Sequence, residues 1–351
     1  MSVAPETEAT ALSLEPERDA IIVGRSPWGL AGRRLLHNRL ALAALVLFLL
    51  IVGVSFAAPF YAKHVARTAP FVSNLSGTIR LHGKKVSVIQ QGTGKLGLGE
   101  TPIGPTWRSH YLLGADSQGR DVAARVLYGG RASLEIGVGS AVLACVLATL
   151  LGLVAGFFTG AVDAILSRLM DLVWAFPVYL LAISLATVLL TLPNGLKLGF
   201  VTLQASSLWV PTLIIGFIYV PYVFRPVRGH VLSLREKEFV EAATGLGASA
   251  WRVIFGEILP NVASTVIVLL PLMIATTILT ESALSYLSIG VQAPNASWGT
   301  IIDDGQALLY TRPMVAIAPG VMIVLTVLAL NVLGDGLRDA LDPRARVRLK
   351  R

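Results

Sequence analysis

Charged residues are scarce in this chain. Asp, Glu, Lys and Arg make up only 14% of its 351 residues, whereas an ordinary soluble protein has about 25%. Apolar residues make up 54%, and the mean hydropathy is +0.70. A soluble fold of this length needs a charged surface that this composition cannot supply, and the same figures exclude a disordered, collagen-like or coiled-coil chain. The composition predicts a polytopic membrane protein.

The sequence also lacks the usual motifs of enzymes and metalloproteins. Its single cysteine, Cys145, excludes an internal disulfide and a cysteine-based zinc site. The five histidines are scattered, without an H-E-x-x-H pattern, and there is no G-x-S-x-G motif and no P-loop. No basic patch with interleaved aromatic residues indicates a nucleic-acid surface. We therefore expect no catalytic residue, cofactor site or metal site, and no nucleic-acid partner.

Long stretches without charge are what the sequence does contain. Because a helix needs about 20 apolar residues to cross a bilayer, we read each such stretch as a transmembrane helix. They contain no alternation of polar residues, so a β-barrel is not indicated. We predict an all-α protein with six spans: Leu40 to Ala62, Ile136 to Val162, Leu172 to Leu196, Leu198 to Phe224, Ile258 to Thr280 and Pro313 to Gly334.

The third and fourth stretches are separated only by Lys197. One helix from Leu172 to Phe224 would overshoot the membrane, and residues 191 to 195, Thr-Leu-Pro-Asn-Gly, supply a turn. We therefore expect two spans, with the fourth helix running from about Ser207 to Phe224. Pro177, Pro211 and Pro221 are expected to kink their spans.

Lys and Arg residues predict the orientation. With the N-terminus inside, 17 of the 29 basic residues fall in internal segments, as the positive-inside rule requires. The first span follows an acidic tail, so it is read as a retained anchor and not as a cleaved signal. Both termini are expected in the cytoplasm. This gives a division into a tail, a first helix, an external segment, a core with the other five spans and a second tail: 1–38, 39–62, 63–130, 131–334 and 335–351.

The external segment contains a predicted β-hairpin. Thr78 to Leu81 and Val86 to Ile89 flank four residues that include Gly83, which suits a turn. Either this hairpin contacts an external partner or it is a solvated insertion, and the second reading is favoured.

The internal segment 225–257 has the most distinctive pattern. Helix-forming residues cluster from Arg235 to Ala243, Gly245 and Gly247 follow, and a helical pattern resumes from Ala248 to Phe255. The segment thus predicts a helix, a glycine bend and a second helix, because Gly247 permits the left-handed backbone of a sharp reversal. Such a shape is more typical of a docking element than of a passive connection.

This pattern resembles the EAA loop of permease subunits in binding-protein-dependent ABC importers. The matching residues are Glu241-Ala242-Ala243, then Gly247, then Glu257-Ile258-Leu259-Pro260. Glu257 departs from the family, which has an aliphatic residue there.

Three further stretches resemble the C-type permease of the dipeptide, oligopeptide and nickel branch. Gly114 to Asp121 resembles G-T-D-x-x-G-R-D, Leu284 to Gln292 with Ser297-Trp298-Gly299 resembles L-S-F-L-G-L-G-V-Q with S-W-G, and Gly334 to Arg344 resembles the C-terminal signature. Ala115, Ser288 and Ala293 depart from the pattern. The resemblance covers residues 108 to 344 and leaves out the hairpin.

The resemblance implies a type I importer permease in the bacterial inner membrane. Its partners would be a second permease in a heterodimer, two cytoplasmic ATPases that bind ATP and Mg, an external substrate-binding protein and membrane lipid. A coupling helix, Glu241 to Phe255, would dock on one ATPase. The residues implied in ATPase coupling are Glu241, Ala242, Ala243, Gly247, Trp251, Leu259 and Pro260.

The cargo implied is a short peptide, with nickel chelates or glutathione-like compounds as alternatives. The sequence assigns no cargo-contacting residue. A secondary transporter would require intramembrane ionisable residues and an inverted repeat, and a membrane enzyme would require clustered polar groups at one depth. The six stretches show neither, so both remain remote alternatives.

A few single residues carry expectations of their own. Arg168 and Asp171 are three residues apart and are expected to pair. Glu281, at the outer end of the fifth span, is expected to face either the pathway or water, with water favoured. Gly152, Gly156 and Gly160 recur every fourth residue, which suits close helix packing.

Overall fold

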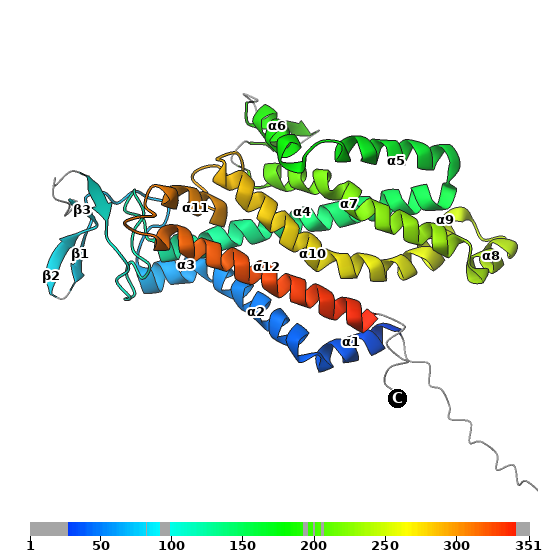
Figure 1. Ribbon diagram of the computed structural model, residues 1–351, viewed down its shortest axis with the longest axis horizontal. Coiled ribbons are helices and arrows are strands. Elements are labelled where there is room, and N and C mark those ends of the chain that lie inside the picture. Colours follow the sequence, from blue (N-terminus) through cyan, green and yellow to red (C-terminus); the bar gives the residue numbers. More distant parts are fainter. Residues whose placement is uncertain are drawn as a thin grey trace, which may run out of the picture.

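The computed structural model is an elongated bundle of helices (Figure 1). It describes residues 27–81, 83–91, 99–191, 196–198, 201–204 and 207–341. The acidic part of the N-terminal tail and the last ten residues lie outside the described residues. The predicted all-α class is confirmed, since strands occur only as short hairpins in the described ranges.

Five helices among the described residues are long and apolar enough to cross a membrane. The fourth of them continues without interruption from α9 (Ala250–Val253) through a π-helical segment, η2 (Ile254–Ile258). The bent pair of α5 (Gly160–Trp174) and α6 (Val178–Leu190) counts as a sixth span if it is taken as one broken helix. The five helices are α2 (Arg39–Phe56), α4 (Val122–Phe158), α7 (Trp209–Arg235), α10 (Leu259–Tyr286) and α12 (Met314–Leu341).

The third predicted span is a broken helix and not a straight one. The chain forms α5 (Gly160–Trp174) and then α6 (Val178–Leu190), whose axes differ by 87°. Pro177 lies at this break. The helix is interrupted there because proline has no N–H to donate and disfavours a helical backbone at Phe176. The turn predicted at 192–195 lies outside the described residues; beyond it, β5 (Leu196–Leu198) pairs with β6 (Val201–Leu203).

Most helices extend well beyond the charge-free stretches that predicted them. α4 begins at Val122 rather than Ile136, so the external segment ends before residue 130. α7 begins two residues after the predicted Ser207 but continues eleven residues past Phe224. Charged residues are good helix formers, so a lack of charge marks the part of a helix that suits lipid and not its ends.

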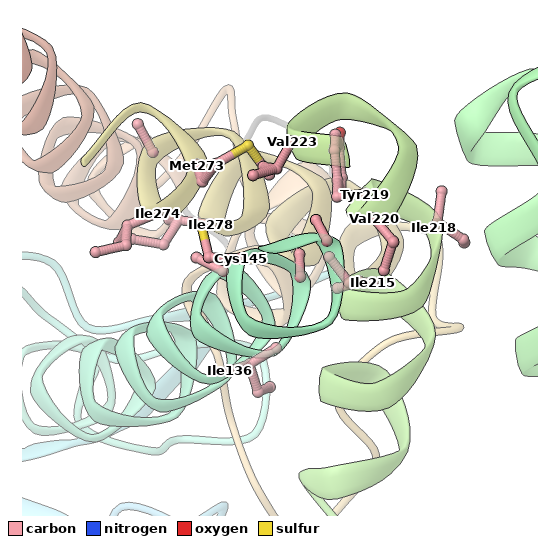
Figure 2. Close-up of a cluster of buried hydrophobic side chains, with 14 of the residues drawn as sticks. Ile136, Cys145, Ile215, Ile218, Tyr219, Val220, Val223, Met273, Ile274 and Ile278 are labelled. Carbon is pink, nitrogen blue, oxygen red and sulfur yellow. The ribbon is translucent and has the colours of Figure 1, made fainter. Parts of the chain in front are cut away.

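The core lies where α4, α7 and α10 meet (Figure 2). α4 and α7 make the most extensive contact of any two elements described. A Cβ atom at Gly152 or Gly156 would lie 2.6 or 2.7 Å from the side chains of Val227 and Val231, so these glycines let the backbones approach. Gly160 differs, because its position is open and its φ is +58°; it begins α5 and serves no packing.

One end of the bundle carries two short β-hairpins, in the segment that was predicted to be external (Figure 1). β1 (Thr78–Leu81) pairs with β2 (Lys84–Ser87), and β3 (Ile89–Gln91) pairs with β4 (Glu100–Pro102), both antiparallel. The second strand starts two residues before its predicted position, because Gly83, with φ +79°, closes a shorter turn. A small separate core, formed by Val88, Ile103, Tyr111 and Ala115, lies beneath the hairpins.

Helix α11 (Trp298–Gln306) lies at the same end as the hairpins (Figure 1). Ser297 caps it in a reciprocal capping box with Thr300. The opposite end carries α8 (Glu238–Gly245) and α9, together with α1 (Pro27–His37) and the last turn of α12. The two described chain ends and the 225–257 segment therefore share one side of the bundle.

Candidate functional site

The candidate site is the segment 236–258, which we call the hook. α7 ends at Arg235, Lys237 is extended, and α8 follows (Glu238–Gly245). After a reversal, α9 leads through η2 directly into α10. The predicted order of helix, bend and helix is confirmed, although the first helix begins three residues later than predicted. The hook is thus a rigid continuation of one membrane-spanning helix.

A Schellman turn makes the reversal at the end of α8. The amide of Ala248 donates to the carbonyl of Ala243 over 3.1 Å, and the amide of Gly247 donates to the carbonyl of Thr244 over 3.0 Å. Gly247 has φ +81°, which an L side chain adopts only at a cost. A Cβ atom there would meet nothing within 4 Å. The backbone conformation alone therefore requires glycine at this position.

Buried side chains hold the hook against the bundle. Val240 on α8 and Val253 on α9 are buried, as are Ile254 and Ile258 on η2. The Trp251 ring packs edge-on against Phe158, the last residue of α4, with ring centroids 5.8 Å apart. It also stacks on Phe255.

Apolar side chains of the hook are also exposed on its outer surface. Leu246 is 90% exposed and Trp251 is 54% exposed, and Phe239 is exposed as well. Two hollows flank α8, one of about 420 Å³ bounded by Arg235 and Glu241, and one of about 290 Å³ bounded by Leu246 and Arg252. Exposed apolar side chains beside hollows are typical of a surface that a partner covers.

The residues implied by the resemblance separate into two groups. Glu241, Ala242, Gly247 and Trp251 are exposed on the hook, and Ala243 is half-buried there. Leu259 and Pro260 form the first two positions of α10 instead. Leu259 packs against the core, and Pro260 lies two residues beyond the end of the π-helical segment η2 within the continuous helix. The departing residue Glu257 borders the smaller hollow.

Ion pairs join α5 to α7 above the hook. Arg228 donates to Asp163 through both Nε and Nη2. Arg225 donates to Asp171 over 3.0 Å. The prediction that Arg168 pairs with Asp171 is therefore wrong. A spacing of three residues permits an ion pair within α5, but the guanidinium that bonds to Asp171 belongs to Arg225 on the neighbouring helix α7.

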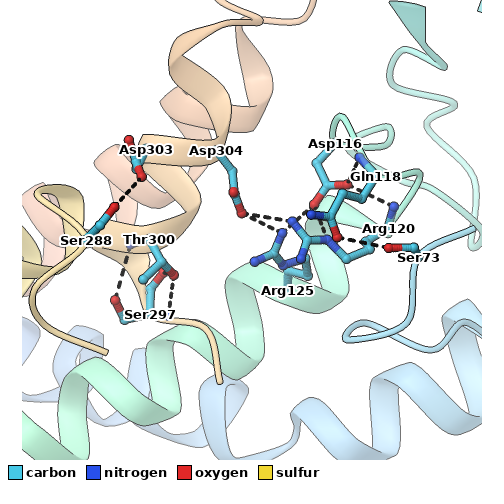
Figure 3. A network of polar contacts seen from close by, with 10 residues as sticks. All are labelled: Ser73, Asp116, Gln118, Arg120, Arg125, Ser288, Ser297, Thr300, Asp303 and Asp304. Carbon is cyan, nitrogen blue, oxygen red and sulfur yellow. Dashed lines mark hydrogen bonds and ion pairs between the residues drawn. The ribbon is translucent and has the colours of Figure 1, made fainter. Parts of the chain in front are cut away.

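A buried charge network closes the other end of the bundle (Figure 3). The Asp116 carboxylate accepts hydrogen bonds from the side chains of Arg120 and Arg125, and both guanidinium groups also reach Asp304 on α11. Asp116 further accepts the backbone amides of Gln118 and Arg120. The Gly114 to Asp121 motif is therefore a structural loop that fastens the external segment to α4 and α11.

Asp121 ends this loop and caps α4. Its carboxylate accepts the amides of Ala124, over 3.1 Å, and of Tyr111, over 2.9 Å. Burial raises the pKa of the Asp121 carboxyl above its ordinary value, while these two hydrogen bonds act in the opposite direction. Sequence reasoning found this motif by resemblance, but no pattern indicated Asp304 as its partner.

Glu281 does not face water, as was favoured, but is fully buried. Its carboxyl group accepts hydrogen bonds from the hydroxyls of Ser285, over 2.7 Å, and Ser282, over 3.3 Å. The hydroxyls of Ser133 and Ser297 also lie near this carboxyl group. The signal for this site in the sequence is the pair of serines that follow Glu281 in α10, Ser282 and Ser285.

No group of three or more potential metal ligands occurs within the described ranges. Cys145 is buried in the core among apolar side chains, where it serves as a small apolar residue. The functional candidates are thus surfaces and ion pairs.

Known proteins resemble this chain over most of its length. A family model described as binding-protein-dependent transport system inner membrane component matches residues 148–347. Another, described as the N-terminal TM domain of oligopeptide transport permease C, matches residues 26–74.

Three curated relatives match this chain over about nine-tenths of its length and of their own length. A glutathione transport system permease protein of Pectobacterium atrosepticum is 33% identical, with 92% of this chain and 93% of the relative covered. A dipeptide transport system permease protein of Alkalihalophilus pseudofirmus is 34% identical, with 92% and 91% covered. An oligopeptide transport system permease protein of Bacillus subtilis is 35% identical, also with 92% and 91% covered.

Proposed function

This chain belongs to the family of binding-protein-dependent transport system inner membrane components, and from that premise we propose that it forms one half of the translocation pathway of an ATP-driven importer of short peptides. It is a permease subunit with several membrane-spanning helices. The observation that carries the proposal is the hook, a rigid element whose exposed apolar side chains lie at one end of the bundle.

The hook docks a cytoplasmic ATPase in this proposal. Leu246 and Trp251 enter the contact, and the two hollows beside α8 receive side chains of the ATPase. Because α9, η2 and α10 form one continuous helix, a pull on the hook moves a membrane span directly. ATP and Mg bind to the ATPase, and their hydrolysis changes the position of this span between two states of the pathway.

The remaining partners follow from the same family. A second permease completes the pathway, a second ATPase docks beneath it, and an external binding protein delivers the cargo to the end with the hairpins and α11. Both termini and the hook lie in the cytoplasm of a bacterium. The excess of Lys and Arg in the internal segments supports this orientation.

The cargo is a short peptide. Relatives named for dipeptide, oligopeptide and glutathione transport support this class, since all three names describe small peptides with free carboxylates. Nickel chelates remain the alternative cargo.

Reconstitution tests the proposal. The chain is purified with its partner permease, its ATPases and its binding protein, and the complex is placed in proteoliposomes. We expect uptake of labelled trialanine or glutathione only with ATP inside the compartment that the hook faces. Uptake by this chain alone, driven by a proton or sodium gradient, would contradict the proposal and favour a secondary transporter.

A further inference from the structure

Two opposite charges lie half-exposed where α5 meets α7. The side chains of Arg225 and Asp171 form an ion pair of 3.0 Å and are 48% and 52% exposed. Asp171 lies eleven residues after Gly160, and Arg225 lies ten residues before Arg235. The pair is therefore about 15 Å along both helices from the end that carries the hook. Asp171 directly precedes the charge-free stretch Leu172 to Leu196, and Arg225 directly follows the stretch Leu198 to Phe224. The pair therefore lies at the boundary of the apolar stretches, where its half-exposed charges meet water or a partner subunit.

Aromatic rings hold the guanidinium of this pair in place. The Arg225 guanidinium lies over the Trp174 ring, 5.0 Å from its centroid, and the rings of Trp174 and Tyr222 are 6.0 Å apart. Within the part of the chain that the structure describes, the guanidinium has one hydrogen bond, to Asp171. A guanidinium carries five N–H donors. Most of its donors are thus left for a ligand, while stacking fixes their direction.

The neighbouring ion pair shows what a purely structural contact looks like here. Arg228 and Asp163 bond through both nitrogens that face the carboxylate, and their side chains are more buried than those of Arg225 and Asp171. The Arg225 pair has one hydrogen bond and lies beside the 87° break between α5 and α6. The Arg225 pair is thus the looser and more exposed of these two contacts between α5 and α7.

We propose that Arg225 and Asp171, flanked by Trp174 and Tyr222, form a contact site for zwitterionic peptide cargo at the end of the pathway nearer the hook. A peptide carboxylate bonds to the free N–H groups of Arg225, and the ammonium group of the same peptide pairs with Asp171. The two cargo charges replace the single bond between the two side chains, so binding leaves no charge unpaired. This inference rests on the proposed function, because it requires a peptide to travel between the permease subunits.

The first test measures peptides moved per ATP hydrolysed, in proteoliposomes that hold the full complex with its loaded binding protein. For Arg225→Gln we expect this ratio to fall about tenfold with trialanine, which corresponds to one lost charged contact, and Arg225→Lys to restore part of it. A merely structural role would reduce the amount of complex but not the ratio. An unchanged ratio for Arg225→Gln would overturn the site. A wild-type complex that moves neither trialanine nor glutathione would contradict the proposed function instead.

The second test uses a cysteine in the Cys145→Ala chain, which then contains no other. Tyr222 and Phe217 are exposed to similar extents, 40% and 48%, on different faces of α7. In the complex, we expect Tyr222→Cys to react with a charged, membrane-impermeant thiosulfonate and to be protected by trialanine delivered on the binding protein. The matched variant, Phe217→Cys, should show no such protection. A Tyr222→Cys that does not react, or that trialanine does not protect, would overturn the site.

Discussion

The two ends of the bundle are held together by different kinds of contact. At the end with the hairpins, the buried side chains of Asp116 and Arg125 pair directly, and Arg125 also pairs with Asp304 (Figure 3). At the hook, apolar side chains are exposed, with Leu246 at 90%, and no ion pair joins α8 to the bundle among the residues that the structure describes.

The network of Asp116, Arg120, Arg125 and Asp304 forms its ion pairs within one chain, so these residues contribute mainly to stability. The hook is held rigidly by Val240, Val253 and the Trp251 ring, yet it leaves apolar surface that only another molecule can cover. Substitutions should therefore change stability at the first end and coupling at the second.

The largest effect on stability is expected from Asp116→Asn. The substitution removes a buried charge and leaves the two guanidinium groups sharing Asp304, which should cost about 3–5 kcal/mol of unfolding free energy. Thermal unfolding of the purified chain in detergent measures the change. Asp303→Asn serves as the control, since Asp303 makes only an exposed contact with Ser288 and should stay within about 0.5 kcal/mol of wild type. Equal stability of both variants would mean that the external network contributes nothing.

Gly247→Val should have a smaller effect on stability and a larger one on transport. A side chain in the left-handed region costs about 1–2 kcal/mol, and a β-branched one disfavours the reversal that positions α8 against α9. We expect uptake to fall at least about tenfold, the factor that corresponds to 1.4 kcal/mol of lost docking, at normal membrane insertion.

The matched control for this variant is Gly245→Ala, two residues earlier. Gly245 is also open on all sides but has no left-handed backbone, so alanine should be tolerated there or even favoured. Full uptake by Gly247→Val would show that the turn has no part in coupling. Equal losses in both variants would show that the loop rejects any side chain.

Trp251→Ala should loosen the hook without unfolding the bundle. It removes the ring contacts to Phe158 and Phe255, and aromatic pairs of this kind contribute about 0.5–1.5 kcal/mol each. Hydrogen exchange of the α8 and α9 amides should increase, while that of α4 and α7 should not. Trp251→Phe should retain most of the protection. Unchanged exchange in Trp251→Ala would mean that the buried valines alone hold the hook.

The smallest effect on stability is expected from Leu246→Ser. The side chain has almost no contact to lose, so stability should change by less than about 0.5 kcal/mol. Binding of the ATPase to the detergent-solubilised permease should nevertheless weaken about tenfold. Normal ATPase binding by this variant would place the contact elsewhere on the hook.

Sequence patterns that depend on neighbours along the chain predicted the fold well. The charge-free stretches located the spans, and the glycine at 247 located the reversal, because both are local properties of the backbone and its solvent. The 87° break at Pro177 was underestimated as a kink, since a proline permits a bend but surrounding helices decide its size.

Contacts between distant residues could not be predicted in this way. Glu281 was expected in water, yet hydroxyls from three parts of the chain surround it. Asp171 was paired with a residue of its own helix because no pattern shows which helix packs beside it. The coupling residues implied by the resemblance stay a prediction, because only a contact with an ATPase would test them.

Cross-linking in the assembled importer tests docking at the hook most directly. In a Cys145→Ala chain carrying Leu246→Cys, a short bifunctional maleimide should link the permease to an ATPase subunit, and ATP should change the yield. Gln306→Cys, exposed at the opposite end of the bundle, should give no such product. If Leu246→Cys forms no adduct with an ATPase in a complex that still imports peptide, the hook is not the coupling element.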